Sequence, residues 1–229
     1  MKHLKIYSFA LLISAVMPVF MACSDDDDSS ESPSSFCPDA NHPHAIDLGL
    51  KSGVKWSCCN VGATSPEQYG NYYAWGETQP KDAYDWQTYQ YGKSRGSVTN
   101  IGKDISGTQY DAATASWGSS WKMPVDTLIS ELIDSVTTGW INKEWKTVNG
   151  VRGLKFTSKN GAKIFLPAAA HRYGNEQGFV GTNGNYWSST VDPIYPQDAA
   201  CMHFSAATNK CVEGTGSRTY GYVIRPISK

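Results

Sequence analysis

Two Asn-Gly pairs, Asn149-Gly150 and Asn160-Gly161, limit the possible folds of this chain more than any other feature. Asn-Gly is the strongest short signal for a β-hairpin, because both residues tolerate the positive φ angles of a two-residue turn. The pattern around the first pair has a period of two and predicts strands over 145–148 and 151–157. The second pair leads into a strand over 162–166, which Pro167 ends.

Two helices precede these strands in the sequence. The first is short, covers 111–115 and is stopped by Gly118. The second starts after Pro124 and runs to about Val136, with Asp126 placed favourably for the helix dipole. Its apolar residues recur at helical spacing and form one face: Leu128, Ile129, Leu132, Ile133 and Val136.

The rest of the chain predicts short strands and long loops. Further strands are expected at 186–189, 199–205, 209–213 and 220–227, with a Gly/Ser/Thr-rich loop over 92–109 and a glycine-rich loop before 186. The fold class is therefore α+β, with two helices, short twisted antiparallel sheets and long loops.

The first 22 residues have the pattern of a secretory signal peptide. Lys2 and Lys5 precede an apolar run over 9–21, which is shorter than the roughly 20 residues of a membrane-spanning helix. Ala22-Cys23 resembles the lipobox of bacterial lipoproteins, although Phe20 stands where that motif usually has Leu. The resemblance implies cleavage before Cys23 and attachment of a lipid to it.

Residues 23–43 are expected to be an acidic, serine-rich tether. Four adjacent carboxylates over 25–28 repel one another, and they lack the ligand spacing and glycine bend of a calcium loop. The run resembles the export signal of Bacteroidetes surface lipoproteins. That resemblance implies a lipid-anchored protein of the cell outer membrane, displayed on its outer surface, with a periplasmic position as the alternative.

Charge and cysteine content restrict the partners and the chemistry. Loss of Lys2 and Lys5 moves the formal net charge from −1 to about −3, and no basic cluster is present, so nucleic acid is not an expected partner. An exported domain can form disulfides. The candidates are Cys201 with Cys211 across a hairpin, and Cys37 with either Cys58 or Cys59. No metal site is expected, because CxxC spacing is absent and His42, His44, His171 and His203 are scattered.

An ordered set of motifs over about 44–228 resembles the Fibrobacter succinogenes major paralogous domain family. The matching segments are IDLGL (46–50), VKW (54–56), CNVGA (59–63), YGNYYAWGE (69–77), WG (117–118), WKMP (121–124), IFLPAA (164–169), YWSS (186–189) and VIRP (223–226). The resemblance implies that 44–229 is a C-type-lectin-like domain, similar in outline to formylglycine-generating enzymes, in which the two chain ends meet in one sheet. Such a fold carries no activity by itself.

Aromatic residues in the loops point to a binding role. The tryptophans inside the family motifs, Trp56, Trp75, Trp121 and Trp187, are expected in the core. The remaining aromatics are candidate ligand-binding residues: Tyr84, Trp86, Tyr89 and Tyr91. Calcium-dependent sugar binding is not expected, because Gln79-Pro80-Lys81 places a lysine where C-type lectins have a ligand oxygen, and Trp-Asn-Asp does not occur.

The sequence therefore favours a non-catalytic surface module that binds or adheres to a glycan or a protein and needs no cofactor. One alternative is an oxidoreductase of the formylglycine-generating type, in which Cys201 and Cys211 would be the reactive pair. Another alternative is a structural component of a surface assembly. No Ser-His-Asp order, paired-carboxylate motif or phosphate loop stands out in the sequence.

Overall fold

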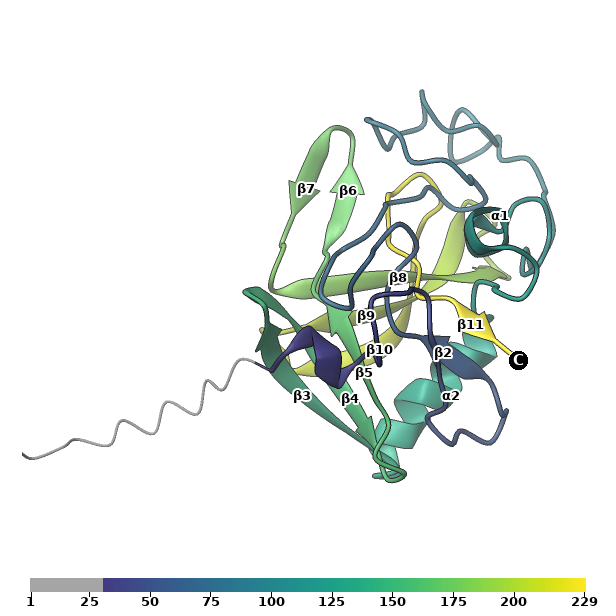
Figure 1. Ribbon diagram of the computed structural model, residues 1–229. Coiled ribbons are helices and arrows are strands. Elements are labelled where there is room, and N and C mark those ends of the chain that lie inside the picture. Colours follow the sequence, from purple (N-terminus) through teal and green to yellow (C-terminus); the bar gives the residue numbers. More distant parts are fainter. Residues whose placement is uncertain (1–30) are drawn as a thin grey trace, which may run out of the picture.

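The computed structural model describes residues 31–229, which form a mixed α+β domain dominated by small antiparallel sheets (Figure 1). The helices are a 3-10 turn at Pro33–Ser35, α1 at Ala112–Trp117 and α2 at Asp126–Thr137. The strands are β1 Ala45–Ile46, β2 Lys55–Ser57, β3 Ile141–Val148, β4 Val151–Ser158, β5 Lys163–Pro167, β6 His171–Tyr173, β7 Glu176–Gly178, β8 Asn183–Val191, β9 Asp198–Ser205, β10 Lys210–Ser217 and β11 Ile227–Ser228. The signal peptide, Cys23 and the tether up to residue 30 lie outside the described residues.

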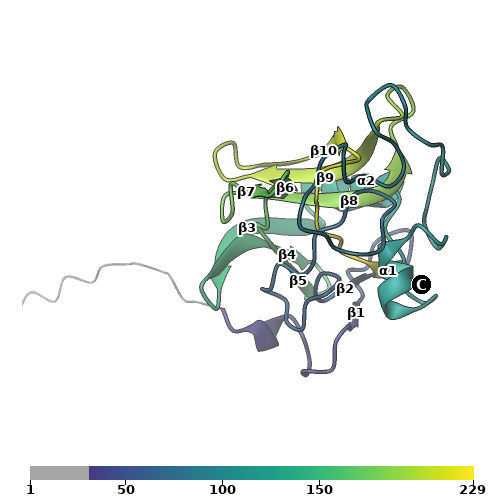
Figure 2. The same ribbon diagram turned by 90° about the horizontal axis from the view of Figure 1, so that it is seen from above.

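Four sheets organise the domain. Their strand orders are β1-β2-β11, β10-β9-β8, β3-β4-β5 and β6-β7. The β8–β10 sheet and the β3–β5 sheet form separate layers (Figure 2), and the β6–β7 hairpin projects from the body at the upper left of Figure 1. In the β1-β2-β11 sheet, Trp56 pairs with Ile46 on one side and with Ile227 on the other, so the start and the end of the domain meet.

The hairpins predicted from the Asn-Gly pairs are confirmed. Val148 pairs with Val151 across the Asn149-Gly150 turn, in which both residues have positive φ angles. Gly161 also has a positive φ angle and directs the chain into β5, which ends at Pro167. The expected closing strand over 220–227 is shorter than predicted, because only Ile227–Ser228 forms a strand and the residues before it make isolated bridges.

Both predicted helices are also confirmed. Asp111 caps α1 by accepting hydrogen bonds from the N–H groups of Ala113 and Thr114, and Gly118, at φ 86°, ends it. The apolar face of α2 buries Ile129 and Leu132 against strands of both larger sheets. None of the helices within residues 31–229 has the length and apolar character needed to cross a bilayer.

The core has two main parts. The larger lies between the sheets and α2, and includes Leu154, Phe156, Leu166 and Phe204, all with no exposed surface. The second surrounds Trp75 and Trp187; the Trp187 ring stacks on Tyr222 with centroids 4.1 Å apart. The expectation that the motif tryptophans pack in the core is correct for Trp56, Trp75 and Trp187, whereas Trp121 is half-buried.

The packed domain begins earlier than the boundary predicted at residue 44. Glu31 accepts hydrogen bonds from Lys155 at 2.7 Å and Lys163 at 3.1 Å. Phe36 is buried against Phe165 of β5, with ring centroids 5.6 Å apart. Residues 31–37 therefore belong to the domain rather than to the tether, because Phe36 and Glu31 both have complementary partners on the β3–β5 sheet.

Candidate functional site

The four aromatic residues proposed from the sequence do not form a surface platform. Tyr84 and Tyr89 are 1% and 0% exposed, so the prediction that they bind a ligand is wrong. Their hydroxyls donate to the carbonyls of Tyr72 and Trp75, which explains the burial of both rings. Trp86 and Tyr91 are half-buried and pack edge-on against Tyr89 from either side.

A different set of aromatic residues lines an open groove of about 320 Å³ beside the β6–β7 hairpin. We call it the aromatic groove. It is lined by Trp86, Arg95, Tyr173, Asp198, Thr215, Gly216, Ser217, Thr219, Tyr220 and Tyr222. Only Trp86 belongs to the set predicted from the sequence. A volume near 300 Å³ is at the lower end of the range of small-ligand sites, about 300–1,000 Å³.

Two backbone bridges bring these distant segments together. The N–H groups of Tyr84 and Gly174 each donate to the other residue's carbonyl at 2.9 Å, which fixes the loop before Trp86 against the end of β6. Arg172 and Gly221 exchange a second pair of bonds, which places Tyr220 beside Tyr173. The rings of Tyr173 and Tyr220 then meet edge to face, 5.4 Å apart.

The groove combines exposed aromatic surface with a charged edge. The Tyr173 side chain is 58% exposed, and the Tyr222 ring reaches the groove because Gly216 has no side chain in its path. Arg95 pairs with Asp198 at 3.2 Å. Burial raises the pKa of Asp198 above its ordinary value, and Arg95 partly offsets that effect. Ser217 and Thr219 add hydroxyl groups to this edge.

The aromatic surface continues from the groove onto the β6–β7 hairpin. His171 stacks between Tyr220, at 5.8 Å, and Phe179, at 6.1 Å. Phe179 is 66% exposed. These residues were not expected from the sequence, although their spacing carries a signal. His171 and Tyr173 are two residues apart, as are Tyr220 and Tyr222, and this spacing places side chains on one face of an extended chain.

Cys201 and Cys211 do not form the predicted bridge. The register of β9 and β10 pairs Cys201 with Gly214, whereas Cys211 lies opposite Phe204. Cys211 is three residues from Gly214, the partner of Cys201, which is about 10 Å along the strand and on the opposite face of the sheet. A disulfide needs Cα atoms within about 7 Å. Burial raises the pKa of each thiol to about 12. The reactive pair on which the oxidoreductase alternative depends is therefore not formed.

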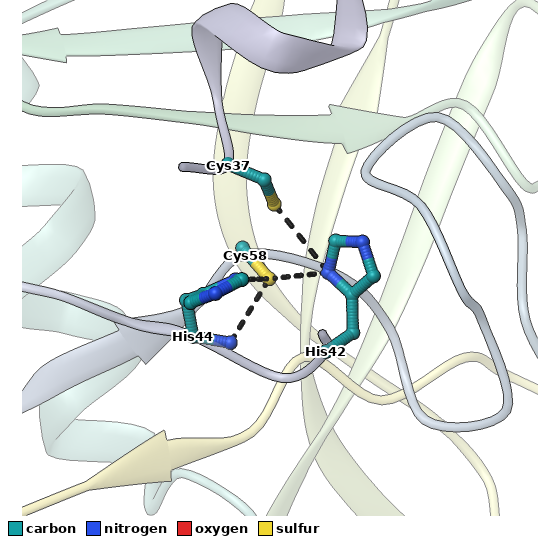
Figure 3. A group of neighbouring side chains, drawn as sticks. All are labelled: Cys37, His42, His44 and Cys58. Carbon is teal, nitrogen blue, oxygen red and sulfur yellow. Dashed lines mark hydrogen bonds between the residues drawn. The ribbon is translucent and has the colours of Figure 1, made fainter. Parts of the chain in front are cut away.

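Two other cysteines, Cys37 and Cys58, converge with two histidines at the end of the β1-β2-β11 sheet (Figure 3). The ligand atoms of Cys37, His42, His44 and Cys58 all lie within 4.8 Å of one another. Cys37 and Cys58 are buried, and the histidines are half-buried. The expectation that the histidines are scattered is wrong for His42 and His44.

Hydrogen bonds concentrate on the sulfur of Cys58. It lies 3.1 Å from Nδ1 of His42 and 3.7 Å from Nδ1 of His44, and it accepts the backbone N–H of His44 at 3.1 Å. Hydrogen bonds from Cys37 and Cys59, together with that N–H, lower the pKa of Cys58. The adjacent Cys59 is also buried, and its sulfur lies 3.6 Å from the carbonyl oxygen of Ala63.

Comparison of the chain with family models, with curated proteins and with solved structures gave no match.

Proposed function

We propose that this chain is a surface lipoprotein whose domain binds a glycan in the aromatic groove, without catalysis. The observation that carries the proposal is the combination of Trp86, Tyr173 and Tyr220 with the Arg95–Asp198 pair around one open groove. Each of these groups suits one part of a sugar.

A sugar ring has an apolar face of C–H groups and an equatorial belt of hydroxyls. The apolar face stacks on exposed aromatic rings such as Tyr173, which has a flat, polarisable surface and loses little conformational freedom on binding. The hydroxyls need donors and acceptors in fixed positions, which Arg95, Asp198 and Ser217 provide. A stable protein partner would instead need a contact surface of about 800 Å² on this domain.

The finer assignment of the fold, as C-type-lectin-like, is part of the same proposal. It rests on the family motifs, on the order of the two helices before the larger sheets, and on β11 pairing with β2. Lys81 forms an ion pair with Glu77 at 2.8 Å, and it stands in the Gln79-Pro80-Lys81 triplet, where the resemblance to C-type lectins would require a ligand oxygen for calcium. The proposed glycan binding is therefore independent of calcium.

The proposed position is the outer surface of the outer membrane, with Cys23 as the lipidated residue. The signal-like segment, Cys23 and the acidic run that follows it support this assignment. The Cys23→Ser variant should leave the membrane fraction, and the unaltered protein should be cleaved by protease added to intact cells. Membrane retention of the variant contradicts lipid anchoring, and full protection on intact cells contradicts surface display.

The binding proposal is tested with the purified full chain on a glycan array, followed by titration with the strongest glycan. Tyr173→Ala should weaken binding about two- to thirteenfold, which corresponds to the roughly 0.5–1.5 kcal/mol of an aromatic contact. Tyr195→Ala is the matched control, because Tyr195 is 56% exposed but lies outside the groove. Absence of binding to any glycan on the array, or an equal loss of affinity in both variants, refutes the proposal. Binding to a protein array without binding to the glycan array favours the protein-binding alternative.

A further inference from the structure

We propose that Cys37, His42, His44 and Cys58 form a structural Zn²⁺ site, which is independent of the aromatic groove. Two thiolates and two imidazoles are a typical ligand set for tetrahedral zinc. The four side chains come from the segment before β1 and from the end of β2, and they point toward one another (Figure 3).

The distances between the ligand atoms fit one small ion. Zn–S bonds of about 2.3 Å and Zn–N bonds of about 2.0–2.1 Å place tetrahedral ligand atoms about 3.3–3.8 Å apart. Nδ1 of His42 lies 3.5 Å from the sulfur of Cys37 and 3.1 Å from that of Cys58. Nδ1 of His44 lies 3.7 Å from the sulfur of Cys58. The remaining pairs lie within 4.8 Å, so a closed shell requires only small side-chain rotations.

The backbone places three of the ligands. His42 and His44 flank Pro43, and their rings lie edge to face with centroids 5.4 Å apart. Ala45 pairs with Ser57, and the Cys58 N–H donates to the His44 carbonyl at 3.0 Å, so the antiparallel ladder sets Cys58 opposite His44. The His44 N–H donates back to the Cys58 sulfur, an arrangement that favours a thiolate.

Asp39 orients His44 in the way that carboxylates orient zinc-bound histidines. Its Oδ1 lies 3.2 Å from Nε2 of His44. The ring therefore carries its proton on Nε2 and leaves the Nδ1 lone pair directed toward the cysteines. Such a carboxylate–histidine–metal arrangement fixes both the tautomer and the ring orientation.

The same two cysteines could instead form a disulfide, and the histidines argue against it. A disulfide has no proton to donate, so the Nδ1 lone pair of His44 would have no partner, and its sulfurs would be only weak acceptors for His42. Two thiolates, by contrast, balance the 2+ charge of zinc and use both histidines. The ion would then attach residues 37–44 to β2.

The first experiment measures Zn²⁺ binding by the full chain. The protein is purified under reducing conditions, stripped with a chelator and titrated with Zn²⁺ alone in competition with a chromophoric chelator. We expect one tightly bound Zn²⁺ per chain and an X-ray absorption spectrum with two sulfur and two nitrogen ligands. Failure to bind Zn²⁺ when alkylation shows every thiol free, or a different ligand set, overturns the proposal.

Variants separate metal binding from folding. Cys37→Ser and His44→Ala should abolish tight binding, and Asp39→Asn should weaken it about 10- to 100-fold, because Asp39 acts only through His44. Asp39 is exposed, so its variant should fold normally, as circular dichroism would show. Cys211→Ser is the matched cysteine control and should bind Zn²⁺ like the unaltered chain.

The competing disulfide is tested on protein isolated from intact cells without reductant. Peptide mass spectrometry should find Cys37 and Cys58 as alkylatable thiols after the metal is removed. A Cys37–Cys58 disulfide in that protein, unaltered affinity in Asp39→Asn, or loss of zinc in Cys211→Ser overturns the proposal.

Discussion

The hydroxyl of Tyr89 accepts a hydrogen bond from Nε of Arg218 at 2.8 Å in the core of the domain. Arg218 is 1% exposed, and its guanidinium lies 4.6 Å from the centroid of the Trp75 ring. Its Nη1 donates to the carbonyls of Thr99 and Pro196, and within residues 31–229 no carboxylate forms an ion pair with it. The buried cation is therefore stabilised by neutral oxygens and an aromatic face.

Tyr89→Phe removes one of these oxygens and should lower the free energy of unfolding by about 1.5–3 kcal/mol, because a hydrogen bond to a charged group is lost in a buried site. Urea denaturation measures the change. Tyr195→Phe is the matched control, since its exposed side chain should change stability by less than about 0.5 kcal/mol. Equal stability of the two variants would contradict the role assigned to Tyr89.

Asp111 does more than cap α1. Its Oδ1 accepts from Ala113 and Thr114, and its Oδ2 accepts from the N–H groups of Gly107 and Met123, at 2.8 and 3.0 Å. Asp111→Ala should therefore cost more than the roughly 0.5–2 kcal/mol of an ordinary cap. The control is Asp85→Ala, which removes bonds within one exposed turn. A loss for Asp111→Ala below about 1 kcal/mol in urea denaturation would show that the two loop bonds are dispensable.

Gly184 lies directly against the ring of Phe204. A Cβ at this position would come within 2.1 Å of that ring, so Gly184→Ala forces β8 or the ring to move. Overpacking of this kind costs about 1–3 kcal/mol. Gly178→Ala is the matched control, because its Cβ would meet no atom within 4 Å. Thermal unfolding should show a lower midpoint for Gly184→Ala alone, and a normal midpoint would mean that the sheet yields without cost.

The docking of the N-terminal segment should depend on pH. Burial raises the pKa of Glu31, but hydrogen bonds from Lys155 and Lys163 outweigh burial and hold the pKa below its ordinary value. A lowered pKa in the folded state means that the stabilisation is present above the unfolded pKa, near 4.5, and is lost as the pH falls through the folded value.

Glu31→Gln should therefore be less stable than the unaltered chain at pH 7, and the difference should shrink as the pH falls below 4. Urea denaturation at pH 7 and pH 3 tests this. Glu176→Gln, at an exposed position of β7, should show no difference at either pH. A constant difference for Glu31→Gln across this range would show that its charge does not hold the segment.

The local elements of this fold follow from short stretches of the sequence. Asn149-Gly150 and Asn160-Gly161 specify turns because few other residues adopt their backbone angles, and the period of the apolar residues specified α2. The α+β class follows from these elements. They are short-range properties, and each depends on residues within a few positions of one another.

The contacts between distant side chains depend on the tertiary structure. Tyr84 and Tyr89 resemble surface aromatics in sequence but are buried in the structure. Their hydroxyls donate hydrogen bonds to the carbonyls of Tyr72 and Trp75. Cys201 and Cys211 lie apart because the register of β9 and β10 does not place them opposite each other. That register depends on the turn of the hairpin, which the positions of the cysteines do not reveal. The groove residues and the Cys37–His44–Cys58 cluster come together through long-range pairing, and spacing along the chain does not encode that pairing.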